Sequence, residues 1–391
     1  MIKPAIVIVA YNREDSLLRL LRSIENAIYD YDDIKLVISI DWSDNLSKVK
    51  ACADAFVWKH GEKIIRTFDE NMGLRKHVLS CGDLSEKYGA VIILEDDLAV
   101  AEDFYNYTVK ALNYYENEKK IVGIALYSHI WNGYARVPFS PIKNASSVYI
   151  AQFSISWGQA WSFEQWNTFK KWYEKNQKLP KHDERIPDTI LGWPETSWSK
   201  YFAYYMITND KYYVVPYNSM TTNYHEAGVH SKRQTSVHHV PVQHGRGNYS
   251  FIPFEKADKY DCFFERMSFA NLEKEGYTAG NTVIDLNGFK HIPAEKRYFL
   301  SSVNYNFPIV KSYGMLLRPI DENVDNNIPG KKIFLYDLKD CNRKKQDKLH
   351  KHSYGRVRYE VAGYDWRALF PVAINGFKRD LRNLIRRKFK I

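Results

Sequence analysis

The sequence predicts an α/β fold built on a doubly wound mixed sheet. Two observations carry this prediction. Short apolar runs rich in β-branched residues alternate with segments of helical periodicity along the first third of the 391 residues. Such runs, without alternating polar residues, are typical of strands buried on both faces of a sheet. Ligands of doubly wound sheets bind at the carboxyl ends of the strands, so the residues that follow each run are candidates for a functional site.

Strands and helices are expected to alternate from the N-terminus to about residue 127. The apolar runs predict strands at 5–10, 36–40, 63–67, 90–94 and 121–127. Asp15 or Ser16 can cap the first helix, because apolar residues then recur at helical spacing: Leu17, Leu20, Leu21 and Ile24. Further helices are expected through Val49 and Phe56, from Asn71 onward, and over 101–115.

The pattern loosens after residue 128. Ser162 and Gln165 have the spacing of a capping box, and the helix behind them carries an aromatic stripe, which is more often core than function. A short helix at 198–206 and a strand at 212–215 follow, before a turn-rich segment at 223–230.

Composition is that of a globular protein, with 45% hydrophobic and 26% charged residues. No apolar stretch reaches the roughly 18 residues of a membrane-spanning helix, and no signal-peptide core follows Met1, so a cytoplasmic protein is expected. The cysteines form no CxxC pair, which argues against a disulfide scaffold or a cysteine zinc site.

The positive charge lies at the C-terminus. Residues 366–391 hold eight basic residues and one acid, which is +7 of the net +10. Nucleic-acid binding is therefore not expected, because the rest of the chain is nearly balanced. The segment predicts a basic amphipathic helix at about 371–390, with Pro371 in its first turn and an apolar stripe at Ala373, Ile374, Phe377, Leu381, Leu384, Ile385 and Phe389. Such a helix binds an anionic membrane surface, here the inner face of the cell membrane, or docks on the body of the protein.

Three consecutive carboxylates, Glu95, Asp96 and Asp97, end the apolar run at 90–94. Charges at the end of a buried strand are unfavourable unless a cation binds them. Oxygen ligands suit Mg²⁺ or Mn²⁺, and a metal held by one or two carboxylates can also bind a diphosphate. The alternative is an acidic start to the next helix, where anions are favoured.

Residues 91–104 closely resemble the metal-binding segment of GT-A glycosyltransferases. The likeness is strongest to N-acetylglucosaminyltransferase I and to bacterial family 2-like transferases that build surface polysaccharide. Other segments occur in the matching order: 7–13 looks like the first strand and nucleotide loop, 39–41 like the second-strand acid, 71–76 like the donor-side loop and 156–161 like the turn beside the acceptor. The resemblance covers about residues 5–235, and 284–290 and 311–314 look like an extension of some bacterial members.

The resemblance implies a GT-A domain at 1–235, with a nucleotide-sugar half at about 1–127 and an acceptor half at about 128–235. An α+β extension of unknown role would occupy 236–330, and the basic C-terminal segment 331–391. The implied activity is metal-dependent, inverting transfer of a sugar from a nucleotide diphosphate sugar, expected to be a UDP-sugar. The implied acceptor is a glycan or a lipid-linked glycan of bacterial surface polysaccharide.

The resemblance also implies site residues. Asp97 would bind Mn²⁺ or Mg²⁺, with His230 as a further metal ligand unless it is structural. The donor would contact Ala10, Tyr11, Asn12, Arg13, Asp41, Arg75, Lys76, Glu95 and Asp96. The acceptor would contact Trp157, Gly158, Trp161 and Trp198.

The catalytic base is the point where the chain departs from its relatives. They carry an acid directly after a tryptophan, whereas Ser199 follows Trp198 here. Glu195 is the expected substitute, and Asp188 is the next candidate. An inverting transferase needs such a base to take the proton of the acceptor hydroxyl.

Two other functions fit parts of the sequence. A sugar nucleotidyltransferase would also use a strand-end acid, but residues 10–13 lack the glycine-rich basic loop that it needs. A non-catalytic carbohydrate-binding protein is suggested by the 10 Trp, 29 Tyr and 20 Phe residues.

Overall fold

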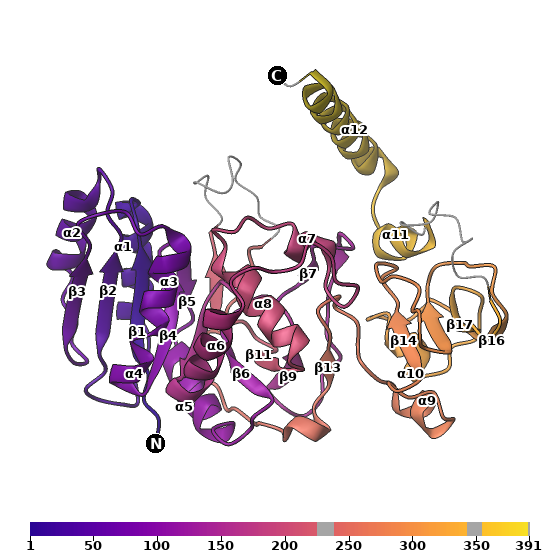
Figure 1. The fold of residues 1–391 in the computed structure, drawn as a ribbon, viewed down its shortest axis with the longest axis horizontal. Helices are drawn as coiled ribbons and strands as arrows, with labels where there is room; N and C mark the ends of the chain where they lie inside the picture. Colours follow the sequence, from indigo (N-terminus) through magenta and orange to yellow (C-terminus); the bar gives the residue numbers. More distant parts are fainter. Residues whose placement is uncertain (225–237, 342–353, 390–391) are drawn as a thin grey trace.

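The computed structural model describes residues 1–224, 238–341 and 354–389 (Figure 1). Its centre is a nine-stranded mixed sheet in the order β13-β9-β11-β6-β10-β4-β1-β2-β3. The strands are β1 (Ala5–Ala10), β2 (Leu36–Ile40), β3 (Lys63–Thr67), β4 (Ala90–Glu95), β6 (Ile121–Ala125), β9 (Val148–Ala151), β10 (Gln159–Ser162), β11 (Tyr212–Pro216) and β13 (Lys259–Tyr260). The expected α/β class and mixed sheet are confirmed.

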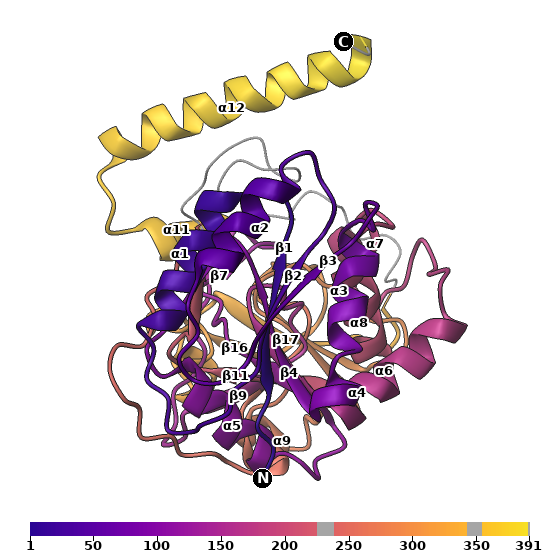
Figure 2. The same cartoon turned by 90° about the vertical axis from the view of Figure 1, so that its left-hand side faces the viewer.

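The apolar runs of the N-terminal third form parallel strands because both of their faces are covered. β1 pairs in parallel with β2 and β4, so Ile6 lies between Leu36 and Ile92. Ile6 and Ile8 pack into a core with α1 (Glu14–Glu25), α2 (Leu46–Ala55) and α5 (Phe104–Tyr114). Successive strand residues point to opposite faces. The other face of the sheet packs against α3 (Leu74–Gly82), α6 (Phe163–Lys175) and α8 (Trp198–Thr208), and Figure 2 shows these two groups of helices on opposite sides of the strands.

Two helix starts can be compared with their sequence signals. The capping box of α6 is present, because Ser162 Oγ accepts from the Gln165 amide and Gln165 Oε1 accepts from the Ser162 amide. The first helix instead begins at Glu14, with Arg13 at the N-cap and no side-chain cap, so the expected cap at Asp15 or Ser16 was wrong. Asp15 lies in the first turn, where an acid is still favourable.

A second, four-stranded sheet lies beside the large one (Figure 1). Its order is β14 (Thr282–Asp285), β15 (Tyr298–Ser301), β17 (Ile333–Asp337) and β16 (Ile309–Tyr313). The sheets cross both expected domain boundaries, 235 and 330. β13 joins the large sheet through β9, and β17 joins the small one through β15. Strand pairing over long sequence separations sets these limits, and local composition does not reveal it.

Short elements complete the fold. They are α4 (Ser85–Tyr88), α7 (Asp188–Leu191), α9 (Ala270–Lys274), α10 (Glu322–Asp325), the 3₁₀ turn η1 (Phe254–Lys256), the pair β5 (Leu98–Val100) and β12 (Thr221–Asn223), and the pair β7 (Trp131–Asn132) and β8 (Val137–Pro138).

The chain ends in α11 (Tyr354–Val361) and α12 (Trp366–Phe389), and α12 projects from the rest of the molecule in both views (Figures 1 and 2). α12 starts before the expected residue 371, because Asp365 Oδ1 accepts from the Arg367 amide 2.9 Å away and caps it. Pro371 therefore lies inside the helix and not in its first turn. Phe377 on this helix is 69% exposed. Among the described residues, no helix combines the length and apolar character needed to cross a bilayer.

Candidate active site

The acidic triplet lies where β1 and β4 end side by side. The Asp96 amide donates to Val9 O over 3.1 Å, which continues the pairing of the two strands. The side chain of Asp96 is buried, and Oδ2 accepts from the Tyr11 amide at 3.4 Å. The loop after β1 therefore faces the triplet, as the sequence predicts for a site at the carboxyl edge.

Arg13 is the basic side chain that this loop directs at the triplet. Its guanidinium forms an ion pair with Asp96 and lies 3.2 Å from Asp97 Oδ2. Burial lowers the pKa of Arg13, but Asp96 and Asp97 outweigh that effect, so the net shift is upward and the side chain stays charged.

Negative charge exceeds positive charge at this strand end. Burial raises the pKa of Glu95 to about 8, and Asp97 and Asp96 add to the rise, which Arg13 and a hydrogen bond from Trp198 oppose. Burial also raises the pKa of Asp96 to about 6, against the effect of Arg13. Glu95 is therefore mostly protonated at neutral pH, and among the described residues the carboxylates of Asp96 and Asp97 share one cation, Arg13.

Asp97 also contacts the ribbon formed by β5 and β12. Asn223 Nδ2 donates to Asp97 Oδ1 over 3.3 Å, and the Tyr224 amide donates to the Asp97 carbonyl over 3.0 Å. β12 pairs antiparallel with β5, which places Asn223 opposite Leu98. His230, the other expected metal ligand, lies outside the described residues.

The carboxylates fit a divalent cation only as part of a larger ligand set. Within the residues that the structure describes, no three histidine, cysteine or acidic side chains converge as a metal cage does. One or two carboxylates suffice for Mg²⁺ when water and phosphate oxygens supply the other ligands. The oxygen chemistry of Asp96 and Asp97 and the surplus of negative charge agree with that mode of binding.

Asp41 ends β2 and holds the loop that opens α3. Its Oδ1 accepts from the amides of Trp42 and Met72, both at 2.9 Å, and its Oδ2 accepts from the Gly73 amide at 3.0 Å. Gly73 has a φ of +72°, a conformation that favours glycine. The Asp41 amide donates to Ala10 O over 2.9 Å, so the ends of β1, β2 and the loop are joined. In this structure Asp41 positions the donor-side loop.

His77 lies behind this loop and was not predicted as part of the site. It is buried on α3, and its Nε2 lies 2.8 Å from Ser39 Oγ on β2. Burial lowers its pKa to about 4; Asp41 opposes the shift and Arg66 adds to it. His77 is therefore neutral at physiological pH and links α3 to the second strand.

The start of α8 brings further expected residues to the same edge. Trp198 hydrogen-bonds Glu95, so the helix begins against the end of β4. Glu195 accepts from Lys200 Nζ at 2.7 Å and from the Tyr201 hydroxyl. These two donors lower the pKa of Glu195, whose side chain is 66% exposed. Glu195 is thus an ionised, exposed carboxylate near the start of α8.

The two basic residues of the donor-side loop differ in their surroundings. Arg75 Nη1 donates to the Tyr201 hydroxyl over 2.8 Å, which ties α3 to the group that holds Glu195. Lys76 is exposed. Asp188 begins α7 with a side chain 71% exposed, 3.7 Å from His182 Nδ1. No contact joins Asp188 to the triplet in the described part of the chain.

The expected acceptor residues differ in how deeply they are buried. Trp157 is partly buried, with its ring centroid 4.7 Å from those of Tyr127 and His238. Gly158 has a φ of +98°, and a Cβ there would lie 2.8 Å from Thr221 Cγ2. Trp161 has no exposed surface; it packs in the core, so its side chain does not line a site.

Sequence reasoning missed the residues that support this site from other elements. They are His77, Lys200, Tyr201 and Asn223. Lys200 is five residues from Glu195, and that spacing across a helix start is the one signal that could have found it. Tyr201 is six residues from Glu195, whereas His77 and Asn223 act across sequence separations that leave no local pattern.

Comparison with known proteins finds a family that the N-terminal part of the chain resembles. Residues 5–182 match Glycosyl transferase family 2. No curated protein matches the chain. Three solved structures are similar in part. S. aureus TarS 1–349 is 11% identical, over 56% of this chain and 59% of that one, with a TM-score of 0.35. The mannosyltransferase PcManGT from Pyrobaculum calidifontis in complex with GDP-Man and Mn²⁺ is 12% identical, over 48% of this chain and 50% of that one, with a TM-score of 0.29. GalNAc-T7 with UDP, GalNAc and Mn²⁺ is 13% identical, over 57% of this chain and 43% of that one, with a TM-score of 0.38.

The chain spans between 43% and 59% of the length of these structures. The family match covers the strands and loops that carry the acidic triplet, Arg13 and Asp41. Residues 5–182 are therefore similar to glycosyl transferase family 2.

Proposed function

We propose that the protein transfers a sugar from a nucleotide diphosphate sugar, a UDP-sugar, to a hydroxyl of a glycan or lipid-linked acceptor in bacterial surface polysaccharide synthesis. The observation that carries the proposal is the acidic triplet at the end of β4, which faces the loop after β1 inside the family 2 match. Transfer is proposed to invert the anomeric centre and to depend on Mn²⁺ or Mg²⁺.

In this proposal Asp97, with Asp96 beside it, holds the cation, and His230 is a further ligand. The cation, when bound, would neutralise charge on the departing nucleoside diphosphate. Arg13, which pairs with the triplet, and Arg75, which is held by Tyr201, would supply positive charge for the phosphates, and the exposed Lys76 would be a third donor. Asp41 orients the loop at 71–73 toward the nucleotide.

Glu195 is proposed as the base that accepts the proton of the acceptor hydroxyl. Lys200 and Tyr201 keep the carboxylate ionised, and its exposed position leaves it accessible to an acceptor. The second candidate remains Asp188. A sugar nucleotidyltransferase and a non-catalytic binding protein are less consistent with the family 2 match.

The proposal is tested by donor turnover in two variants. Asp97→Ala should fold normally and lose nearly all metal-dependent release of UDP from a panel of UDP-sugars. Asp54→Ala, on the exposed face of α2, is the matched control and should keep wild-type turnover. Full activity of Asp97→Ala, or undiminished wild-type activity in excess chelator, would contradict the assignment.

We also propose that α12 lies on an anionic membrane surface at the inner face of the cell membrane, near a lipid-linked acceptor. Exposed apolar side chains on α12 and the +7 charge of residues 366–391 support this.

A further inference from the structure

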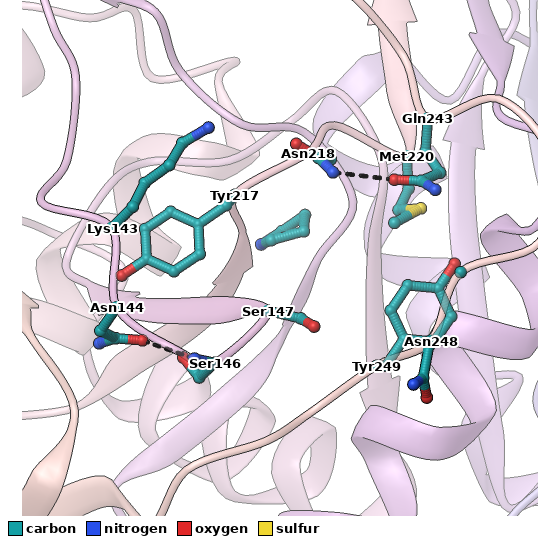
Figure 3. Close-up of a pocket in the computed structure, with 12 residues that line it drawn as sticks. Lys143, Asn144, Ser146, Ser147, Tyr217, Asn218, Met220, Gln243, Asn248 and Tyr249 are labelled. Carbon is teal, nitrogen blue, oxygen red and sulfur yellow. Dashed lines mark hydrogen bonds between the residues drawn. The ribbon is translucent and has the colours of Figure 1, made fainter.

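A polar groove runs along the large sheet at the ends of β6, β11 and β9. It consists of two adjoining cavities of about 280 and 420 Å³. Four side chains line both cavities: Lys143, Tyr217, Asn218 and Gln243. Figure 3 shows the first cavity, with Tyr217 and Tyr249 on opposite sides. Each cavity is near the lower end of the roughly 300–1,000 Å³ typical of ligand pockets, and the joined groove is longer than either.

The topology places this groove at the same edge of the sheet as the acidic triplet. β4 and β6 both pair antiparallel with β10, so they run in the same direction. β11 is parallel to β6 and ends at Pro216, where antiparallel β9 begins at Val148. The residues just beyond these strand ends, which include Ser147 and Asn218, therefore lie at the carboxyl edge.

Hydrogen bonds connect the groove to the candidate active site. Ser219 Oγ accepts from the Ser128 amide at 2.9 Å, which anchors the chain just before β12. β12 carries Asn223, whose amide reaches Asp97. Val240, which lines the second cavity, donates its N–H to Thr222 Oγ1 over 3.0 Å. The second cavity thus adjoins the strand that contacts the triplet, and the first lies farther along the edge.

The lining chemistry suits a neutral polyhydroxyl ligand. The first cavity presents mainly amides, hydroxyls and aromatic rings, whereas the second also has aliphatic side chains in its lining, and neither cavity has a carboxylate in its described lining. Asn218 Oδ1 and the Asn248 amide make no hydrogen bond within the part of the chain that the structure describes. A side-chain amide both donates and accepts, as a sugar hydroxyl does. Lys143 and His244 are too few cations for a strongly anionic ligand.

The two tyrosine rings are held in place before any ligand binds. The Tyr217 hydroxyl donates to Ile142 O over 2.7 Å, and the Tyr249 hydroxyl donates to Asp103 Oδ2 over 2.7 Å. Because their polar ends are engaged inside the protein, each presents an apolar ring to the cavity. Fixed rings reduce the entropy cost of binding.

We infer that this groove binds a neutral oligosaccharide, namely the sugar units that follow the reacting unit of an extended acceptor. That the bound oligosaccharide is an acceptor depends on the proposed function. That the groove binds an oligosaccharide depends on the groove alone.

The test is binding of neutral oligosaccharides of one to six units, on a glycan array and then by titration calorimetry with the full chain. At least one of them should bind more tightly as it lengthens from one to three units. Asn218→Ala combined with Asn248→Ala should weaken binding by about 5- to 150-fold, since each lost hydrogen bond contributes roughly 0.5–1.5 kcal/mol. The control is Asn117→Ala, which should not weaken binding, because Asn117 is exposed and precedes β6 at the opposite edge of the sheet.

Two further measurements separate this inference from the proposed function. The groove double variant should keep wild-type release of UDP from donor in the absence of acceptor, and Asp97→Ala should keep oligosaccharide binding. If the wild type does not turn over any donor, the proposed function is contradicted, but the inference that the groove binds an oligosaccharide is not. The inference is overturned if no neutral oligosaccharide binds, if only anionic glycans bind, or if the double variant binds as the wild type does.

Discussion

At the residue scale, the candidate site depends on the ion pairs and hydrogen bonds of a few charged side chains. Arg13 pairs with Asp96 and Asp97 across two strand ends, whereas Glu195 pairs with Lys200 and Tyr201 at a helix start. The first group holds a surplus of negative charge at the base of the site. The second holds an ionised, exposed carboxylate near the start of α8.

Replacing Glu195 by Gln should lower turnover with acceptor by about 100- to 10,000-fold, because a positioned base is lost. Donor affinity should change little, since Glu195 contacts no residue of the triplet. Steady-state kinetics and donor titration measure the two effects, and thermal melting checks that the buried Lys200 tolerates the change. Asp188→Asn is the comparison; if it causes the loss and Glu195→Gln does not, Asp188 is the base.

His77 should make stability depend on pH. The folded protein holds its pKa near 4, against an ordinary value of 6.5, so acid protonates the unfolded chain first. The His77 contribution to the free energy of unfolding is complete above about pH 7 and is lost as pH falls from 6.5 through 4. Between pH 7.5 and 5 the loss is about 2 kcal/mol.

Urea unfolding of His77→Gln and of the wild type at pH 7.5 and pH 5 measures the His77 contribution to the free energy of unfolding. The variant should lose less stability on acidification, by about that amount. His291→Gln, at an exposed position, should follow the wild type. Parallel curves for wild type and His77→Gln would show that His77 does not carry the effect.

At the scale of elements, α3 and α6 determine how the donor-side loop is supported. α3 starts at that loop and ends against α6, where Trp166 Nε1 donates to Asp83 Oδ1 over 2.8 Å. Lys170 Nζ lies 2.6 Å from Asp83 Oδ2. Gly82 lets the two helices approach, because a Cβ there would lie 2.3 Å from the Trp166 ring.

Gly82→Ala should therefore destabilise the protein by about 1–3 kcal/mol, the usual cost of an overpacked core. Denaturant unfolding measures it. Gly376→Ala is the matched control, since a Cβ at this helical position has open space around it and should cause no loss of stability, or a gain of up to about 1 kcal/mol from the higher helix propensity of alanine. A wild-type midpoint for Gly82→Ala would mean that Trp166 moves aside without cost.

At the scale of the whole molecule, two sheets and a projecting helix divide the chain. The large sheet carries the candidate site and the groove at one edge, and the small sheet has its own core. α12 projects from both in Figures 1 and 2. It carries exposed apolar side chains, Phe370, Val372 and Phe377 among them, and the segment 366–391 carries a charge of +7, which together motivate the proposed membrane contact.

The full chain should therefore sediment with anionic vesicles at low salt, while a truncation after Gly363 should stay in the supernatant and still turn over donor. Each basic residue near the surface contributes roughly 1 kcal/mol, so the difference between the two chains should shrink in high salt and on neutral vesicles. Equal binding of the two chains, or binding by neither, would refute the membrane role.

The elements that the sequence predicted best are those whose signal is local. β1 and β2 have the expected limits because apolar runs buried on both faces need no partner to be recognised. The acidic triplet could also be predicted, since three charges after a buried strand are unusual by themselves. The placement of side chains relative to residues far away in the sequence could not be predicted. Trp161 looked like a site residue, yet antiparallel pairing of β10 between β4 and β6 turns it into the core.

By itself, the sequence determined the α/β class, the strand ends that carry the acids and the basic C-terminal segment, because each depends on neighbouring residues. Only the tertiary structure decided which side chains meet there. Asn223 reaches Asp97 across 126 positions, and Tyr249 and Ser147 face one cavity although about a hundred residues separate them. Such contacts follow from the order in which strands pair, and that order is set by the packing of the whole sheet, not by any short segment of the chain.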